Sequence, residues 1–251
     1  MRYAVLADIH GNLDALTAAL TWLAGERIDR YLCAGDVVGY GAEPAACMRA
    51  VDALRATWVA GNHEAACADP TGLERFHEAA RRAIEWTRAQ LQPADLARLA
   101  ALPLTATDGP CTLVHGTLED PARFDYLMSS GQIPGTVERC RTLFCVVGHT
   151  HVPLLAEYDR RKGRVSRVCT DAAALADAPF CDDTDAVRYL LNPGSVGQPR
   201  DGDPRASLAV IDTGRRRLSV HREPYDVASA QRKILEAGLP EFLAARLAEG
   251  R

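Results

Sequence analysis

The chain has 251 residues, of which 47% are hydrophobic and 25% charged, the composition of an ordinary globular protein that can bury a core. Its formal net charge of -4 gives no general attraction to nucleic acid or to an anionic membrane, and no long run of Lys and Arg supplies a local one. The apolar run from Met1 to Ala7 is too short for a membrane span and lacks a signal-peptide layout, so we expect a cytoplasmic protein. Eight cysteines without a CxxC pair predict neither a disulfide framework nor a thiolate zinc site.

The first part of the chain alternates short apolar strands with helical patterns. The predicted strands are residues 2–7, 31–34, 57–60, 111–114 and 144–147. The predicted helices are residues 13–23 after Asn12, about 44–54, 73–90 and about 93–102. Strands that alternate with helices are typical of an α/β fold.

The second half of the chain is rich in strands and turns. Short strand-like runs cover residues 154–158, 164–170, 188–191, 207–211 and 218–220, and a helix near 227–236 follows them. We therefore expect one α/β domain over residues 1–251, with two mixed β-sheets packed face to face in a sandwich and helices on the outer faces. The second sheet is expected to come mostly from residues 152–221, and C-terminal helices from 226–248. The basic stretch 160–167 is expected to be a solvated hairpin turn.

Polar side chains recur where the predicted buried strands stop. In an open α/β sheet the carboxyl ends of the strands line one crevice, so residues far apart in sequence can converge there. A single His after a strand is usually a turn residue, but five of the seven histidines belong to this one pattern. The set consists of Asp8, His10, Asp36, Asn62, His63, His115, His149 and His151.

These residue types suit a pair of divalent cations. Imidazole nitrogens together with carboxylate and amide oxygens favour Mn, Fe, Co, Ni or Zn over Mg or Ca, which prefer oxygen alone. Two such ions, about 3.5–4 Å apart, can share a carboxylate and a bridging water whose lowered pKa provides a hydroxide nucleophile. Because only two carboxylates are present in the set, the centre would stay net positive and would favour a phosphate oxyanion.

Five blocks, taken in order, closely resemble the calcineurin-like metallophosphoesterase superfamily. They are Asp8-Ile9-His10, Gly35-Asp36, Gly61-Asn62-His63-Glu64, His115 and Gly148-His149-Thr150-His151. The resemblance implies the fold of that superfamily and two metal ions, one held by Asp8, His10 and His151 and the other by Asn62, His115 and His149, with Asp36 bridging them. It also implies that His63 is not a ligand but contacts the scissile phosphate and protonates the leaving oxygen or stabilises its charge.

The segment after the second strand separates branches of this superfamily. The protein Ser/Thr phosphatases carry GDxxDRG there, whereas this chain reads Gly35-Asp36-Val37-Val38-Gly39-Tyr40-Gly41, which disfavours a protein phosphatase. The Gly-His-Thr-His pair and the Asn192-Pro193-Gly194-Ser195-Val196-Gly197 segment are similar to the compact bacterial and archaeal phosphodiesterases. GDVVGYG-type segments also resemble dinucleoside polyphosphate hydrolases.

Three residues are candidates for substrate binding, and each has a structural alternative. Asn12 could donate to phosphate or serve as the N-cap of the first helix, which we favour. Arg200 could bind a distal phosphate or lie in a solvated loop. Tyr40 could stack on a base or simply cover the cleft. His77 and His221 lie outside the motifs, and we assign them no role.

The sequence thus predicts a hydrolase for a phosphodiester or phosphoanhydride, with a small phosphorylated substrate such as a nucleotide or a dinucleoside polyphosphate. A phosphomonoesterase of the same fold and a non-catalytic scaffold are the alternatives, since a retromer subunit resembles this fold and serves as an interaction protein. The presence of both Asn62 and His63 argues against a scaffold. The lack of a basic stripe disfavours a nuclease, no membrane partner is expected, and a homo-oligomer stays open.

Overall fold

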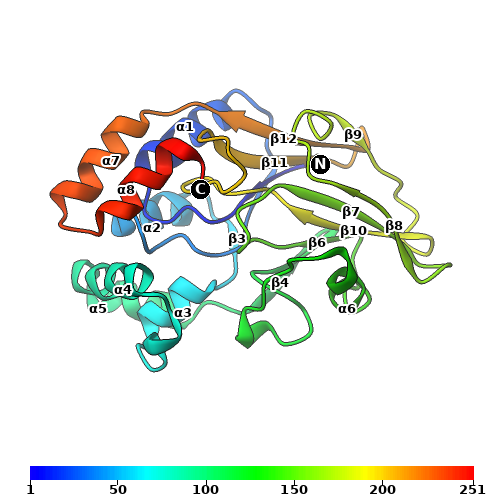
Figure 1. The fold of residues 1–251 in the computed structure, drawn as a ribbon. Helices are drawn as coiled ribbons and strands as arrows, with labels where there is room; N and C mark the ends of the chain where they lie inside the picture. Colours follow the sequence, from blue (N-terminus) through cyan, green and yellow to red (C-terminus); the bar gives the residue numbers. More distant parts are fainter.

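The computed structural model describes residues 1–251, and two six-stranded mixed sheets form its centre (Figure 1). The first sheet has the order β3-β2-β1-β11-β12-β9. Its strands are β1 (Arg2–Leu6), β2 (Arg30–Cys33), β3 (Thr57–Trp58), β9 (Ala178–Pro179), β11 (Ala206–Asp212) and β12 (Arg217–Glu223). Strands β1, β2 and β3 are parallel, and β11 joins β1 in the antiparallel direction.

The second sheet has the order β4-β5-β6-β10-β7-β8. Its strands are β4 (Thr105–Asp108), β5 (Cys111–Val114), β6 (Phe144–Val146), β7 (Leu154–Asp159), β8 (Arg164–Cys169) and β10 (Val187–Asn192). Strands β5, β6 and β10 are parallel, while β4, β7 and β8 pair antiparallel with their neighbours. Each sheet therefore contains a parallel segment, and the predicted class of two mixed sheets is confirmed.

Helices cover the outer faces of this sandwich and gather at one end of it (Figure 1). The helices are α1 (Leu13–Ala24), α2 (Pro44–Ala53), α3 (Asn62–Ala68), α4 (Glu78–Gln90), α5 (Pro93–Ala100), α6 (Ile133–Val137), α7 (Val227–Glu236) and α8 (Glu241–Glu249). Helices α1 and α2 pack on the first sheet, and α6 packs on the second. Helices α7 and α8, which are orange and red in Figure 1, pack together, and α7 also contacts α1.

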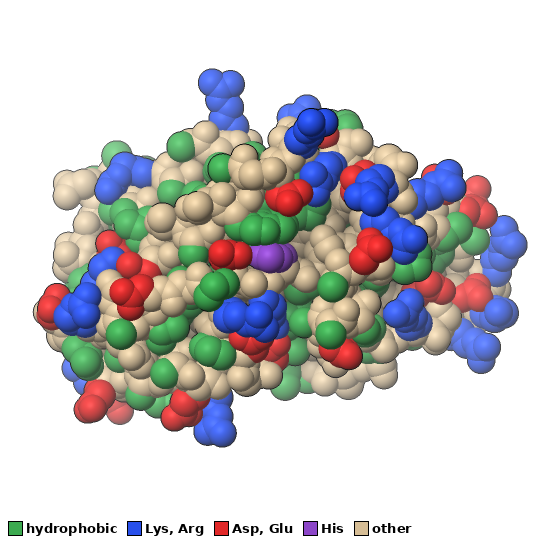
Figure 2. Space-filling model, turned by 90° about the horizontal axis from the view of Figure 1, so that it is seen from above, with side chains coloured by type: hydrophobic (Ala, Val, Ile, Leu, Met, Phe, Trp, Pro, Cys, Tyr) green, Lys and Arg blue, Asp and Glu red, His purple; other side chains and the backbone are tan.

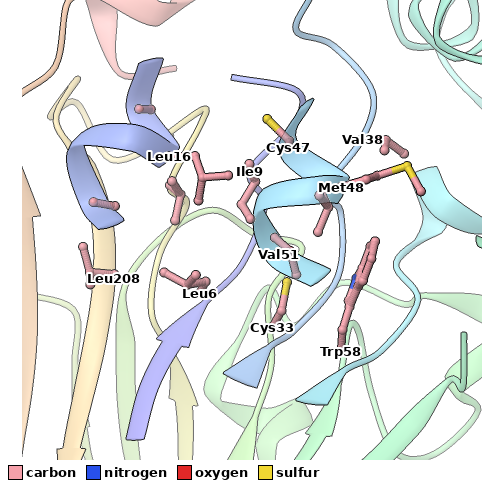
Figure 3. Close-up of a cluster of buried hydrophobic side chains, with 14 of the residues drawn as sticks. Leu6, Ile9, Leu16, Cys33, Val38, Cys47, Met48, Val51, Trp58 and Leu208 are labelled. Carbon is pink, nitrogen blue, oxygen red and sulfur yellow. The ribbon is translucent and has the colours of Figure 1, made fainter. Parts of the chain in front are cut away.

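The alternation of side chains along β1 explains why the strand is apolar from Tyr3 to Leu6. Tyr3 and Val5 point between the two sheets, whereas Ala4 and Leu6 point towards the helices. Figure 3 shows the helical side, where Leu6 lies near Leu16 of α1 and Val51 of α2. Because both faces of the strand are covered from Tyr3 to Leu6, these four positions form a continuous hydrophobic run.

The predicted assignment of strands to the second sheet is wrong in part. Strands β11 and β12, expected there, return to the first sheet, where Val210 pairs with Ala4. Strands β4, β5 and β6, which precede residue 152, form half of the second sheet instead. Apolar periodicity identifies a strand but not its hydrogen-bonding partner, and the open edge of β1 accepts β11.

The long helix predicted over residues 73–90 is shorter than expected. Gly72 has φ 89°, a 3-10 turn covers Leu73–Arg75, and Phe76 is extended, so α4 begins only at Glu78. The side chain of His77 caps α4 by accepting from the N–H of Ala80. Helix α3, which the sequence did not predict, begins at Asn62 and therefore carries two of the candidate residues.

The basic stretch forms the exposed turn between β7 and β8, as predicted. Arg161 and Lys162 lie in solvent and pair with Asp183 and Asp159. Acidic and basic side chains are mixed over the face that Figure 2 shows, with no continuous basic stripe on it. None of the helices combines the length and the hydropathy that a membrane crossing requires.

Candidate metal centre

The predicted ligands follow the carboxyl ends of the parallel strands of both sheets. Asp8 and His10 follow β1, Asp36 follows β2, His115 follows β5, and the histidines of the Gly-His-Thr-His motif follow β6. Asn62 and His63 begin α3, after β3. The crevice expected at the edge of one sheet is in fact formed where the parallel segments of two packed sheets end together.

The structure brings these side chains into two groups that share Asp36. Asp8, His10, Asp36 and His151 offer donor atoms within 4.8 Å of one another, and so do Asp36, His115 and His149. Every member of both groups is buried. A carboxylate common to both groups is the arrangement that a pair of cations requires.

Individual distances define the second group and bring Asn62 into it. The Nε2 atom of His115 lies 3.2 Å from Oδ2 of Asp36, 3.1 Å from Nδ1 of His149 and 3.1 Å from Oδ1 of Asn62. All four donors therefore converge on one point. In the first group, Nε2 of His151 lies 3.4 Å from Oδ1 of Asp8.

Hydrogen bonds to the backbone fix which nitrogen of each ring faces the centre. Nδ1 of His10, His115 and His151 lies 3.1, 2.7 and 2.6 Å from the carbonyl oxygens of Val38, Ala34 and Gln198 respectively. A carbonyl only accepts, so each Nδ1 carries the proton and, in a neutral ring, Nε2 presents its lone pair. This is the orientation that backbone carbonyls impose on histidines that bind metals.

The lone pairs on the Nε2 atoms of His10 and His151 then face one another, and a cation between them would remove their repulsion. Nε2 of His10 and Nε2 of His151 are only 3.1 Å apart, and in the neutral tautomers neither has a proton to donate. Burial lowers the pKa of both rings well below the ordinary value, which favours those neutral forms. The residues present therefore fit a divalent cation at this position.

The two carboxylates differ in their electrostatic surroundings. Burial raises the pKa of Asp8 to about 7, against the opposing effect of His115. Asp36 is also buried, but the nearby His115, His63 and His10 outweigh that effect and hold its pKa well below the ordinary value. Burial would lower the pKa of His115, but the Asp36 carboxylate raises it to about 9. Asp36 is thus the fixed negative charge around which the imidazoles gather.

His63 lies beside this centre and outside both donor groups. Its side chain is buried, its Nδ1 has no hydrogen-bond partner, and its ring packs 4.8 Å from that of His10 and 4.4 Å from that of Tyr40. Burial lowers the pKa of His63 to about 4, so the ring is neutral at neutral pH. A Cβ on Gly39 would lie 2.1 Å from Nδ1 of His63, so only glycine leaves room for this ring.

Glu64 is a functional residue to which the sequence analysis gave no role. Its buried carboxylate accepts the N–H groups of Asp36 and Gly61 on one oxygen, at 2.6 and 2.8 Å, and those of Val37 and Val38 on the other, at 2.6 and 3.1 Å. Burial and the Asp36 carboxylate raise its pKa to about 7, and the N–H groups oppose this shift. The signal was its place at the third position of α3, where an acidic side chain can accept the N–H of the N-cap residue, here Gly61.

The Asn192–Gly197 segment ties the metal-binding turns together. Nδ2 of Asn192 donates to the carbonyl of Gly148 at 2.8 Å, and Oγ of Ser195 donates to the carbonyl of Asp8 at 2.7 Å. The N–H of Gly197 donates to the same carbonyl at 3.0 Å. This segment therefore joins the turn after β1 to the turn after β6 without contributing a donor to either group.

The three substrate-binding candidates have different outcomes. Asn12 is the N-cap of α1: Oδ1 accepts from Ala15, and Nδ2 donates to Gly197 and Tyr225, which leaves its amide no free group for a substrate. The N-cap role, which the sequence favoured over a contact with phosphate, is therefore the one that the structure shows. Tyr40 and Arg200 both line a cavity of about 1060 Å³ that also exposes Asn62 and His149. His221 is stacked on Trp22, away from the centre.

Comparisons with known proteins agree with this geometry. The family model of the calcineurin-like phosphoesterase superfamily domain matches residues 1–216. An uncharacterized protein of Methanocaldococcus jannaschii is 32% identical over 252 residues, covering 99% of this chain and 98% of that protein.

Solved structures point the same way. A crystal structure of a metallophosphoesterase from Sphaerobacter thermophilus is 38% identical, with a TM-score of 0.84 and coverage of 100% of this chain and 99% of that one. A hypothetical protein from Pyrococcus horikoshii shares the fold, with 21% identity, a TM-score of 0.77 and coverage of 100% and 98%. The chain belongs to the calcineurin-like phosphoesterase superfamily.

Proposed function

We propose that the chain hydrolyses a phosphodiester or phosphoanhydride bond with the help of two divalent transition metal ions. In this proposal Asp8, His10 and His151 hold one ion. Asn62, His115 and His149 hold the other, and Asp36 contacts both. The observation that carries the proposal is the convergence of these side chains on the two donor groups that share Asp36.

The chemistry of the donor set favours borderline transition metals. Four imidazoles, two carboxylates and one amide oxygen suit Mn, Fe, Co, Ni or Zn. When bound, two such ions supply positive charge at the phosphate and lower the pKa of a water to the neutral range. With no Ser or Cys among the donors, the protein itself needs no covalent nucleophile.

His63 is the residue we assign to the reacting phosphate. The ring is neutral before the substrate binds, and a neutral imidazole carries one N–H group. It can therefore donate a hydrogen bond to a phosphate oxygen or to the leaving oxygen. An anionic substrate beside the ring favours the protonated form, because a nearby negative charge raises the pKa of an imidazole. Binding of the substrate would therefore favour uptake of a proton from solvent by the His63 ring, which could then pass it to the leaving oxygen.

A substrate panel with Mn²⁺ tests the proposal. Wild-type protein is assayed with an aryl phosphate monoester, an aryl phosphate diester, cyclic nucleotides and dinucleoside polyphosphates, with His63→Ala as the inactive control. Hydrolysis of a diester or anhydride that is lost in the control is the expected result. Hydrolysis of the monoester alone would identify a phosphomonoesterase, and a metal-loaded protein inert to the whole panel would contradict the proposal and favour a scaffold.

A further inference from the structure

The cavity beside the metal centre is larger than one reacting phosphate needs. It measures about 1060 Å³, and Asn62 and His149 from the centre lie on its wall. Pockets of this size hold ligands of the size of a nucleotide or larger. The cavity therefore leaves room for parts of a substrate other than the scissile group.

Three of the four arginines in this cavity, Arg75, Arg200 and Arg246, have no acidic partner. Neither Arg200 nor Arg246 forms an ion pair with an Asp or Glu side chain, whereas Arg123 of the same cavity pairs with Asp125 and the nearby Arg222 pairs with Asp201. Nε of Arg200 is buried without a hydrogen-bond partner. Buried donors are normally satisfied, so this atom and the unpaired charges of Arg200 and Arg246 fit an anionic group of a ligand.

The two guanidinium groups are held near each other from different parts of the fold. The N–H of Arg200 donates to the carbonyl of His151 at 3.3 Å, which fixes Arg200 to a metal-binding turn. Arg246 lies on α8, where its Cζ atom stacks 5.0 Å above the ring of Phe242 and its Nε donates to the main-chain oxygen of Arg251. Burial and the positive charge of Arg200 lower the pKa of Arg246 to about 10, so the Arg246 guanidinium stays charged at neutral pH. An anion between them would offset this repulsion.

Helix α8 is an addition to the part of the chain that the family model matches. That match ends at residue 216, and α8 begins at Glu241. Leu243 and Leu247 of α8 pack with Ala83 of α4 and Ile234 of α7, and the same cluster includes Tyr40. The shared fold supplies the metal centre, and this packed helix adds a wall to the cavity.

Exposed aromatic rings lie on the rim of the same cavity. Tyr126 is 44% exposed and stacks 3.6 Å from the ring of His149, and Phe242 is 57% exposed. Large exposed aromatic side chains beside a cationic site are the platforms on which nucleobases stack. The cavity thus combines the candidate metal centre, the two arginine side chains and the exposed aromatic rings.

From this arrangement we infer that Arg246 and Arg200 bind a phosphate group other than the reacting one. The substrate then carries at least two phosphates, as a nucleoside or dinucleoside polyphosphate does. The inference rests on the proposed function, because it takes the reacting phosphate to lie at the metal centre.

The test compares the binding of ATP and AMP, which share a base and differ by two phosphates. Binding is measured by titration calorimetry in a His63→Ala background, so that no ligand is consumed, with Mn²⁺ in constant excess. Adding Arg246→Ala is expected to weaken the binding of ATP by about tenfold, the scale of one lost charged hydrogen bond. The affinity for AMP should stay within about twofold of its value in the His63→Ala protein. Arg232→Ala, an exposed arginine on α7, is the matched control and should change neither.

Other outcomes overturn the inference, and they differ from a failure of the proposed function. Equal weakening of ATP and AMP would place Arg246 at the reacting phosphate or in the packing of α8, and unchanged ATP affinity would remove it from the site. Arg246→Gln, which keeps the aliphatic stem as far as Cδ and removes the charge, should also weaken ATP binding, and it guards against an effect of lost packing alone. If the unmutated protein hydrolyses nothing while Arg246→Ala still weakens ATP selectively, the proposed function fails and the anion site stands.

Discussion

Backbone strain is concentrated at the candidate centre. Of nine non-glycine residues with positive φ, six belong to it: Asp8, His10, Asp36, Tyr40, His149 and His151. Such conformations cost about 1–3 kcal/mol each and persist only where the surroundings impose them. Here the N–H of Asp8 donates to Gly35 and that of His10 to Asp36, at 3.0 and 2.9 Å, which holds the two turns against each other. Strain at this density is typical of a site that presents side chains for function.

At the same scale, His63→Ala is expected to separate catalysis from metal binding. The ring contributes no atom to either donor group, so metal content measured by elemental analysis should stay at the wild-type level. Turnover should fall by about 10²–10⁴-fold, the usual contribution of a general acid. His221→Ala, which removes a histidine far from the centre, should behave as wild type. Wild-type turnover in His63→Ala would refute the role.

Among the elements, α3 is the one that organises the site. It carries Asn62 and His63 on its first turn, and its Glu64 binds the loop after β2 through three N–H groups. The N–H of His63 in turn donates to Oδ1 of Asp36 at 2.9 Å. Asp36 is therefore positioned by α3 through two independent contacts. A Cβ on Gly61 would lie 2.1 Å from Oδ1 of Asp36, so this close approach requires a glycine.

Glu64→Gln tests this role as a positioning residue. One amide nitrogen would then face two backbone N–H groups, and each buried donor left without an acceptor costs about 1–3 kcal/mol. We expect the free energy of unfolding of the metal-free protein to fall by about 2–4 kcal/mol in urea titrations. Metal affinity should fall with it, because Asp36 loses its support. Glu85→Gln on the exposed face of α4 is the control, and an equally small effect of both would show that Glu64 does not hold the loop.

At the scale of the whole molecule, the centre lies where the two sheets end together. Donors after β1 and β2 come from one sheet, and donors after β5 and β6 from the other. Bound metal would therefore link the two sheets, and its binding energy would stabilise the fold as a whole.

Chelation should measurably destabilise the protein. A ligand at about 1,000 times its Kd stabilises the native state by about 4 kcal/mol. For a chain of this size that corresponds to a melting temperature lower by about 10 °C after metal removal, followed by calorimetry. Asp36→Asn, which weakens both proposed metal sites, should show a much smaller response to the chelator. A melting temperature that chelation leaves unchanged in the wild type would argue against metals that bridge the sheets.

The local pattern was enough to predict most elements and the candidate ligands. The apolar runs that end in Asp8, Asp36, His115 and His149 were visible because a buried strand and the residues after it are encoded in consecutive positions. The late start of α4, at Glu78 rather than at residue 73, was not predicted. The apolar periodicity of the sequence continues through Phe76, although the backbone of Phe76 is extended.

By itself, the sequence determined the fold class and the donor residue types, since both follow from neighbouring side chains. Tertiary structure decided the rest: that β11 pairs with β1, that Glu64 supports Asp36, that the Nδ2 atom of Asn12 donates to Gly197 and Tyr225, and that Arg246 lies near Arg200. Each of these depends on contacts between residues that are distant in the chain or on competition for one hydrogen-bonding group. Such contacts arise from packing, which no local pattern of residues encodes.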